Sequence, residues 1–583
     1  MRISGCCAVA LCLGLAAPAM AQSGASAPGK SAAQGQGGSS DIVIAAETEK
    51  KSDWKRAETD HVIVLSNGGE GELKRVAGNL ERLYGLMSRI YRRSDPDETV
   101  KLQVTLVDSV DALHAMGLRN SRGDEGSYAA GFAGRLYYDP RADGEVLVVA
   151  RSDETIELDT NKAQNDECDE YQASGGQETC GKALQPILPV ARSWEAVLYS
   201  AFAQHFVQTY IPAAYPRWYM DGVGALFSTL DVRGSGAVDL AHAPSSYIQF
   251  FRSYGVPNVA DVLSGRYLDP AVASKNPWTP YHAWLLAHYF LFSELKPERA
   301  KQFAEYMTAV HQGTPMAEAA KIFGDMGRLQ HEIVVYARNS TEYAHVNAPP
   351  ARDEDPLVTT LSATSAAMIE TKLELGARLA AFPDQPENAA QAREEWIAQV
   401  RAKTAKLPND DDATLVLAEA ECRSGHAAEC LAAAERVLAK TPDNVRALTW
   451  KGVALTDEAV SGPDASRAAT LEAGRQAIRH ANHLDNRAPL PLLAYFQSFI
   501  KAGEPVPDMA MAGMAMLARY VPAAPEPRLY LATELVRQGK ADVARQVIYP
   551  VLYGYDDSPE KKAAQALFAR TDSSTSVAKQ AGS

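Results

Sequence analysis

Strand-like segments occupy only the first part of this chain, and that distribution limits its fold more than any other feature. A β-branched run at residues 61–66 and an alternating run at residues 102–106 both have strand length. Two further apolar runs flank the turn-forming segment 139–144 and predict a hairpin. Nearly every segment from residue 181 to 338 has a helical pattern, and no strand pattern recurs beyond residue 356. This order predicts an α+β fold, with a small β-sheet and a helical subdomain, followed by an all-α domain.

The N-terminus has the layout of a cleavable secretory signal. Arg2 precedes an apolar run at residues 8–17, and the small-residue site Ala-Met-Ala follows at residues 19–21. The run is shorter than the ~20 apolar residues of a transmembrane helix, which argues against the alternative of a retained anchor. We therefore expect cleavage after Ala21, a mature protein that begins at Gln22, and a periplasmic or secreted location. Because no later segment of the sequence approaches membrane-spanning length, we do not expect an integral membrane protein.

Length and charge limit the number of domains and the kinds of partner that we expect. A chain of 583 residues is too long for one ordinary core and predicts two or three domains. The formal net charge of −14 repels a phosphate backbone, so nucleic acid is not an expected partner. The glycine-rich segment 68–71 lacks the Lys-Ser/Thr pair that a phosphate-binding loop requires. No cofactor is expected.

The cysteines predict two local disulfides. Three of the seven lie in the signal, which leaves four in the mature chain. Cys168 and Cys180 bracket a polar loop, whereas Cys422 and Cys430 bracket a tight helical turn. An even number of cysteines in an exported protein favours disulfides over metal thiolates, and four cysteines allow three pairings. We expect the local pairing, Cys168 with Cys180 and Cys422 with Cys430.

One predicted helix, residues 192–209, carries an unusual polar stripe. The helix is apolar around most of its circumference and is therefore expected to be buried. Ser200, Gln204 and Gln208 recur every four residues and lie on a single face of it. The next predicted helix lies in the segment 215–228, which reads Tyr-Pro-Arg-Trp-Tyr-Met-Asp-Gly-Val-Gly-Ala-Leu-Phe-Ser.

These two segments resemble the peptidase MA-like family of gluzincin-type zinc metallopeptidases. In that family a helix with His-Glu-x-x-His-His-Phe precedes a helix of the form Pro-x-Trp-x-x-Glu-Gly-x-Ala-x-x-Phe. Ser200 and Gln204 stand where the family has its two zinc-binding histidines. Ala201 stands at the glutamate that takes a proton from the metal-bound water, and Asp221 at the third ligand, also a glutamate. The resemblance implies a metallopeptidase-like domain that has lost its zinc centre.

The chemistry of these side chains predicts a non-catalytic protein. A catalytic zinc takes three protein ligands with imidazole, thiolate or carboxylate donors, and an open position for water. A serine hydroxyl and a glutamine amide are weak zinc donors, and the general base is missing as well. We therefore expect no metal site and no catalytic residue, with Ser200, Ala201, Gln204 and Asp221 as vestigial positions.

Two interpretations of these positions remain open. They form either a hydrogen-bonded polar seam between two buried helices or part of a retained peptide-binding cleft. The residues assigned to the remnant cleft are Ser200, Gln204, His205, Trp218, Asp221 and His288. For His205, one position past the ligand register, and for His288, a purely structural role is the alternative.

The C-terminal half resembles a tetratricopeptide array. Helical patterns at residues 415–438 are separated by Gly425 and closed by Pro442, as in a helix-turn-helix repeat. Further helix pairs follow at residues 450–485, 489–521 and 528–552, and ordinary helix hairpins are the alternative. The predicted boundaries are a signal peptide at 1–21, a flexible low-complexity linker at 22–53, a peptidase MA-like domain at 54–344, a linker at 345–356, a tetratricopeptide-like helical domain at 357–570 and a disordered tail at 571–583.

Together these features predict an exported, non-catalytic, peptidase-like protein that binds a protein or peptide partner in the cell envelope. Helical repeats stack into concave surfaces that hold peptide segments. Two alternatives remain: an active zinc metallopeptidase whose ligands lie outside the recognised motif, and a structural scaffold for envelope assembly.

Overall fold

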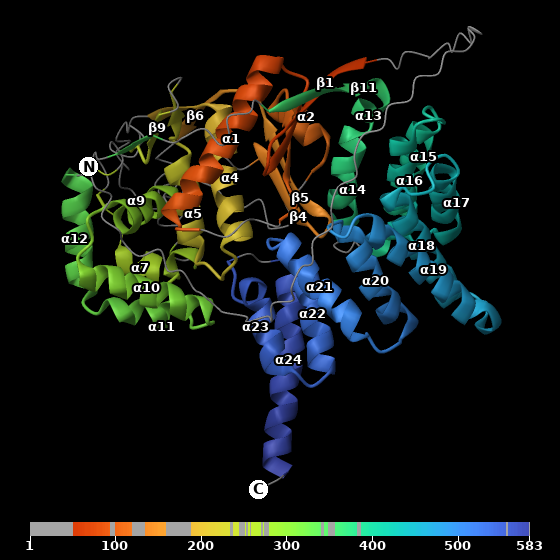
Figure 1. Ribbon diagram of the computed structural model, residues 1–583. Helices are drawn as coiled ribbons and strands as arrows, with labels where there is room; N and C mark the ends of the chain where they lie inside the picture. Colours follow the sequence, from red (N-terminus) through yellow and green to blue (C-terminus); the bar gives the residue numbers. More distant parts are fainter. Residues whose placement is uncertain are drawn as a thin grey trace, which may run out of the picture.

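The computed structural model describes residues 51–93, 99–118, 134–158, 188–233, 237–243, 251, 255–256, 258–269, 272, 279–339, 343–347, 356–381, 386–555 and 558–581. The predicted signal peptide, most of the linker that follows it, and the predicted pair Cys168 and Cys180 lie outside these residues. The described chain mixes α-helices with a small β-sheet (Figure 1). None of its helices combines the length and the apolar character needed to cross a membrane.

A six-stranded sheet forms the centre of the N-terminal part, in the order β11-β1-β2-β3-β5-β4. Its strands are β1 (Lys51–Glu58), β2 (Val62–Ser66), β3 (Leu102–Val107), β4 (Leu136–Arg141), β5 (Gly144–Ala150) and β11 (Leu357–Ser362). The inner strands β2, β3 and β5 pair in parallel, and the remaining pairings are antiparallel. The predicted strands at residues 61–66 and 102–106 and the predicted hairpin are confirmed.

Helices cover both faces of this sheet. Successive side chains of a strand point to opposite faces, and β5 shows the division clearly. Leu147 and Val149 belong to a core that includes α1 (Glu70–Ile90) and α4 (Trp194–Tyr210). Val146 and Val148 belong to a second core on the other face, with α2 (Val110–Ala115) and α14 (Ile369–Ala381). The central strands are therefore apolar on both sides, as buried parallel strands must be.

One strand that the sequence assigns to the C-terminal domain completes this sheet. β11 pairs with β1 along the edge, so the expectation that no strand follows residue 356 is wrong. As an edge strand, β11 leaves side chains in solvent, and Leu357 is 65% exposed. It therefore lacks the regular apolar alternation by which strands are recognised. The predicted linker 345–356 also contains strand residues at its start. There β10 (Ala344–Asn347) pairs with β9 (Ala237–Leu240) in a separate three-stranded sheet.

A helical subdomain packs beside the sheet. Its helices are α5 (Arg217–Phe227), α7 (Val259–Leu263), α9 (Thr279–Phe292), α10 (Pro297–His311), α11 (Met316–Ala319) and α12 (Met326–Asn339), with short 3₁₀ turns at Arg266–Leu268 and Ala320–Phe323. Short strands interrupt the expected helical region: β7 (Leu188–Arg192) pairs with β6 (Glu154–Leu158), and β8 (Asp231–Val232) pairs with β9.

Stacked helix pairs form the C-terminal part. They are α15 (Pro386–Thr404), α16 (Asp411–Ser424), α17 (Ala427–Leu438), α18 (Val445–Ser461), α19 (Asp464–Leu484), α20 (Pro489–Ala502), α21 (Asp508–Tyr520), α22 (Pro525–Arg537), α23 (Ala541–Leu552) and α24 (Pro559–Ala581). The helix pairs drawn from the sequence coincide with α16–α17, α18–α19, α20–α21 and α22–α23. Gly425 ends α16 in the left-handed conformation, which glycine adopts without a steric penalty. α24 continues into the predicted 571–583 tail.

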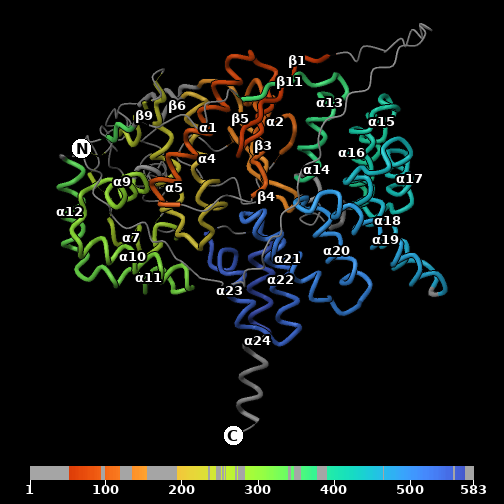
Figure 2. Tube along the Cα trace, in the orientation of Figure 1, coloured from red at the N-terminus to blue at the C-terminus, as the bar shows by residue number. Residues whose placement is uncertain are grey.

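The N-terminal and C-terminal parts are packed against each other. Helices α21 and α22 lie next to the β4–β5 end of the sheet, α24 extends away from it, and α15 to α19 extend to one side, as the ribbon and the Cα trace both show (Figures 1 and 2). Ala142, at the tip of the β4–β5 hairpin, is buried in the core of α20 to α24. The N–H of Val100 donates a hydrogen bond to the carbonyl of Tyr520 at 2.9 Å. The helical half is thus anchored on the sheet by both apolar and backbone contacts.

Candidate functional site

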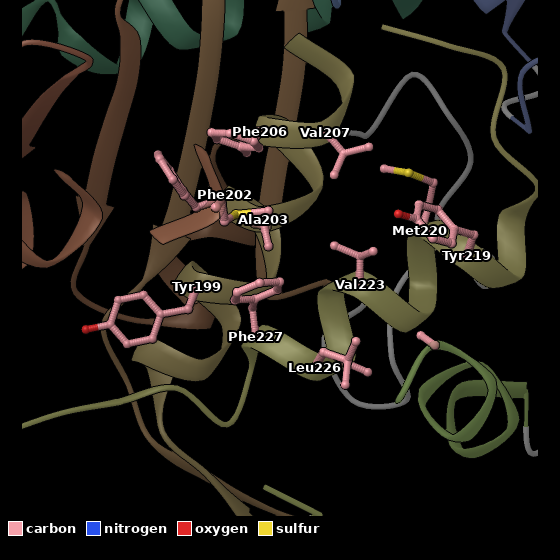
Figure 3. Close-up of a cluster of buried hydrophobic side chains, with 14 of the residues drawn as sticks. Tyr199, Phe202, Ala203, Phe206, Val207, Tyr219, Met220, Val223, Leu226 and Phe227 are labelled. Atoms are coloured by element: carbon pink, nitrogen blue, oxygen red, sulfur yellow. The ribbon is translucent and has the colours of Figure 1, made fainter. Parts of the chain in front are cut away.

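Helices α4 and α5 carry the positions at which the resemblance places a zinc centre. Ser193 caps the N-terminus of α4 by accepting a hydrogen bond from the Ala196 N–H. Every residue of α4 from Val197 to Val207 is buried, and so is every residue of α5 from Trp218 to Phe227. The expectation that the first helix is buried is confirmed. Apolar side chains of the two helices interlock, with Val207 pointing toward α5 and Val223 toward α4 (Figure 3).

Ser200 and Gln204 lie on the face of α4 that contacts α5. The Gln204 amide donates a hydrogen bond from Nε2 to the carbonyl of Met220 at 3.0 Å. Beside it, α5 presents Gly224, and a Cβ placed there would lie 2.7 Å from Ser200 Oγ and 2.9 Å from Gln204 Nε2. The side chains of Ser200 and Gln204 therefore fill the space beside Gly224. This arrangement is that of a polar seam between buried helices.

A second glycine brings α5 equally close to α9 on its other side. A Cβ at Gly222 would lie 2.5 Å from the carbonyl oxygen of Ala283 and 2.6 Å from the Cβ of Ala287. Residues two apart on a helix point about 200° apart, so Gly222 and Gly224 face opposite neighbours. Helix α5 is thus packed between α4 and α9.

Asp221 is buried and pairs within its own helix. Its carboxylate lies 3.4 Å from the Nε of Arg217, one helical turn earlier. Burial, and then the Asp221 charge, raises the pKa of Tyr267 well above its usual value. The carboxylate thus lies near one guanidinium and one neutral phenol.

His205 faces the sheet and not α5. Its Nδ1 lies 3.1 Å from the hydroxyl of Tyr138 on β4 and 3.2 Å from the hydroxyl of Thr209. Burial lowers the pKa of His205 to about 3, so the ring is neutral at physiological pH. The residue therefore serves the packing between α4 and the sheet.

Trp218, on α5, and His288, on α9, have hydrogen-bond partners outside the α4–α5 seam. Trp218 is fully buried and donates from its indole nitrogen to the Tyr306 hydroxyl at 3.2 Å. The His288 ring lies 2.5 Å from the Tyr336 hydroxyl through Nδ1 and 3.1 Å from the Ala241 carbonyl through Nε2. These partners differ from those of Ser200, Gln204 and Asp221. The six residues assigned to a remnant cleft are thus distributed over several packing interfaces.

The last residue of the polar stripe, Gln208, reaches the C-terminal half. Its Nε2 donates a hydrogen bond to the hydroxyl of Tyr555 at 2.8 Å. One polar stripe on α4 therefore contributes to two different contacts, the seam with α5 and the junction with the C-terminal helices.

The donor set at the seam does not fit zinc. Two of the three positions offer a hydroxyl and an amide, and Ala201 offers no proton acceptor. The Gln204 amide donates to the Met220 carbonyl, and the side chains of Ser200 and Gln204 fill the space beside Gly224. Over the described residues, no group of three His, Cys, Asp or Glu side chains is arranged to hold a metal ion.

Of the two predicted disulfides, one lies in the described chain. Cys422 and Cys430 are bonded, with their Cα atoms 5.1 Å apart, and join α16 to α17. Both cysteines are buried in a cluster that includes Trp450.

Sequence reasoning did not identify Gly224 as a contact of the seam, Gly222 as the contact with α9, or Arg217 as the partner of Asp221. The signal was the pair of glycines two residues apart inside an otherwise apolar helix. Glycine is unfavourable within a helix, and its presence there indicates close approach of a neighbouring element.

In comparisons with family models, with curated proteins and with solved structures, nothing matches this chain.

Proposed function

We propose that this protein is an exported, non-catalytic member of the peptidase MA-like type, whose helical half is a tetratricopeptide-like binding surface for a protein or peptide partner in the cell envelope. The observation that carries the proposal is the closed α4–α5 seam. Gln204 bonds to the Met220 carbonyl, and Gly224 brings α5 against Ser200. A working zinc peptidase needs an open metal position there.

The C-terminal helices support the binding role. α16 contacts both α17 and α18, and α18 contacts both α19 and α20. Contacts to the next helix and the next but one are typical of stacked helix pairs, which form extended surfaces for peptide segments. Cys422–Cys430 within the first pair agrees with an oxidising compartment.

A cleavage and binding assay separates the three candidate functions. The mature chain is incubated with unfolded casein peptides, and mass spectrometry and fluorescence anisotropy follow cleavage and binding. We expect binding without cleavage. Cleavage that a chelator abolishes would favour the metallopeptidase. No peptide binding, together with one stoichiometric cross-linked envelope partner, would favour the structural scaffold.

Restoring the family residues tests the resemblance itself. The quadruple variant Ser200→His, Ala201→Glu, Gln204→His and Asp221→Glu should melt at a lower temperature than the natural chain, because larger side chains overpack a closed contact. If the register is right, added zinc binds the native state of the variant and raises its melting temperature again. A folded variant without any response to zinc would contradict the alignment.

A further inference from the structure

A pocket of about 60 Å³ lies where the loop between α4 and α5 meets the C-terminal helices. We call it the junction pocket. Gln208 and Tyr215 line it from the N-terminal side, and Arg528 and Tyr555 line it from the C-terminal side. Four prolines, Pro212, Pro522, Pro525 and Pro550, make much of the remaining wall. The pocket is thus a rigid and mostly apolar concavity shared by the two halves.

Arg528 is the one charged side chain among the described residues that line the junction pocket. Its Nη1 donates to the Val547 carbonyl at 3.0 Å, and its Nε points to the Pro522 carbonyl at 3.4 Å. No described carboxylate pairs with it, and its Nη2 has no hydrogen-bond partner in the described chain. On the same helix, Arg537 is held at 2.7 Å by the carboxylate of Glu534. Arg528 therefore differs from Arg537, because only carbonyl oxygens accept its hydrogen bonds.

Removal from water without a counter-ion is unfavourable for this cation. Desolvation alone lowers the pKa of Arg528 to about 10. The guanidinium stays protonated at physiological pH, so the charge persists in a partly buried position. A charged group in such a position is usually paired with an opposite charge. An anionic ligand would supply that partner.

The polar groups around the cation are held in place. Gln208 donates to the Tyr555 hydroxyl across the junction at 2.8 Å, and the Tyr215 hydroxyl donates to the Ile211 carbonyl at 2.7 Å. Fixed walls with few polar groups are typical of sites for small ligands. A single guanidinium presents a planar fork of donors that matches one carboxylate.

We propose that the junction pocket binds a carboxylate with a small apolar body through Arg528. The carboxylate belongs either to a free small acid or to the C-terminus of a peptide. This inference does not depend on the proposed function, because the pocket lies outside the α4–α5 seam. A bound ligand would contact both halves and stabilise their junction.

Matched acids and amides test the proposal on the full mature chain. Isothermal titration calorimetry compares propionate with propionamide, and Gly-Gly-Ala with its C-terminal amide. We expect each acid that binds to do so at least about tenfold more tightly than its amide, because charge-assisted hydrogen bonds are the stronger ones. Binding of the tripeptide acid alone identifies a peptide C-terminus as the source, and binding of both acids identifies a small-acid site. Equal affinity of acid and amide, or no saturation by either acid across the millimolar range, would overturn the proposal.

Variants locate the binding at Arg528. Arg528→Gln should weaken acid binding at least about tenfold, and Arg528→Lys, which keeps the charge without the planar fork, should weaken it less. Arg537→Gln on the same helix should leave binding unchanged. If Arg528→Gln does not fold, Arg528→Lys still tests the proposal. Unchanged acid affinity in the lysine variant would contradict recognition of the carboxylate by the planar guanidinium. Asp556 and Asp557 lie outside the described residues, and the double substitution of both with Asn tests whether a carboxylate of the chain itself is the partner of Arg528. Acid binding that appears only in this double variant would contradict binding of an external acid by the natural chain.

Discussion

At the scale of single residues, the interior of the molecule holds neutral histidines. Burial lowers the pKa of both His205 and His282 to about 3. An unfolded histidine titrates near 6.5. Between these two values the unfolded chain binds more protons than the folded one, so stability falls as the pH decreases below about 6.5.

His205→Gln should flatten this pH dependence. Each pH unit between about 6.5 and 3 costs the natural protein roughly 1.4 kcal/mol per buried histidine, and the variant has one fewer. We expect a smaller difference in melting temperature between pH 6.5 and pH 5 than in the natural chain. The exposed His483→Gln is the control and should keep the natural difference. Equal pH dependence in both variants would show that His205 titrates normally.

Gly224→Ala should destabilise the seam. The new methyl would lie 2.7 Å from Ser200 Oγ, and forcing α4 and α5 apart costs roughly 1–3 kcal/mol. Gly78→Ala in α1 is the matched control, since its Cβ would meet nothing within 4 Å. That control should be neutral or stabilise the helix by up to ~1 kcal/mol. Differential scanning calorimetry compares the two, and a similar effect of both substitutions would argue that α4 and α5 are not in close contact.

At the scale of elements, α14 connects the sheet to the helical half. Leu373 packs into the core on the second face of the sheet, whereas Leu375, two residues later, packs with Trp396 and Ile397 of α15. Because residues two apart lie on nearly opposite sides of a helix, α14 is buried from two directions. This element therefore belongs to both halves.

Leu373→Ala tests that assignment. Removal of a fully buried leucine side chain should cost roughly 2–5 kcal/mol. Hydrogen exchange should also accelerate in β5, which shares this core. Leu357→Ala, on the exposed side of β11, should change neither measurement. Loss of protection confined to the C-terminal helices would contradict the contact between α14 and the sheet.

The disulfide between α16 and α17 should stabilise the first helix pair. Replacing Cys422 and Cys430 with serine should cost roughly 2–3 kcal/mol, the value for a short closed loop. Titration of the denatured, unreduced mature chain should find no free thiol, because Cys168 and Cys180 are also predicted to pair. Two or more free thiols would disprove the pairing.

Sequence patterns identified most elements but not all of the interfaces between them. The strands β2, β3 and β5 are apolar and regular, and the first helices of the repeat region have clear caps, Asp410 and Gly425 for α16 and Asn444 for α18. The strand β11 was not predicted, because its partner β1 lies about 300 residues earlier in the sequence and an edge strand does not need a regular apolar pattern. The roles of Gly224 and Arg528 depend on which helices meet, and no local pattern encodes that information.

At the scale of the whole molecule, the two halves form a continuous structure. The β4–β5 hairpin enters the core of the C-terminal helices, Val100 bonds to Tyr520, and Gln208 bonds to Tyr555. The polar stripe of α4 that would carry the zinc ligands of a peptidase instead supports internal packing and this junction. We propose that the protein retains peptidase-like helices for structural and binding purposes and not for catalysis.

The most direct test of that claim is the zinc content of the purified mature chain. The protein is incubated with excess Zn²⁺, freed of unbound metal by gel filtration and measured by elemental analysis against protein concentration. We predict far less than one zinc per chain, because Ser200, Ala201 and Gln204 supply neither the ligands nor the base, and the Ser200 and Gln204 side chains pack against Gly224. One zinc per chain, lost together with peptidase activity on chelation, would contradict the non-catalytic assignment.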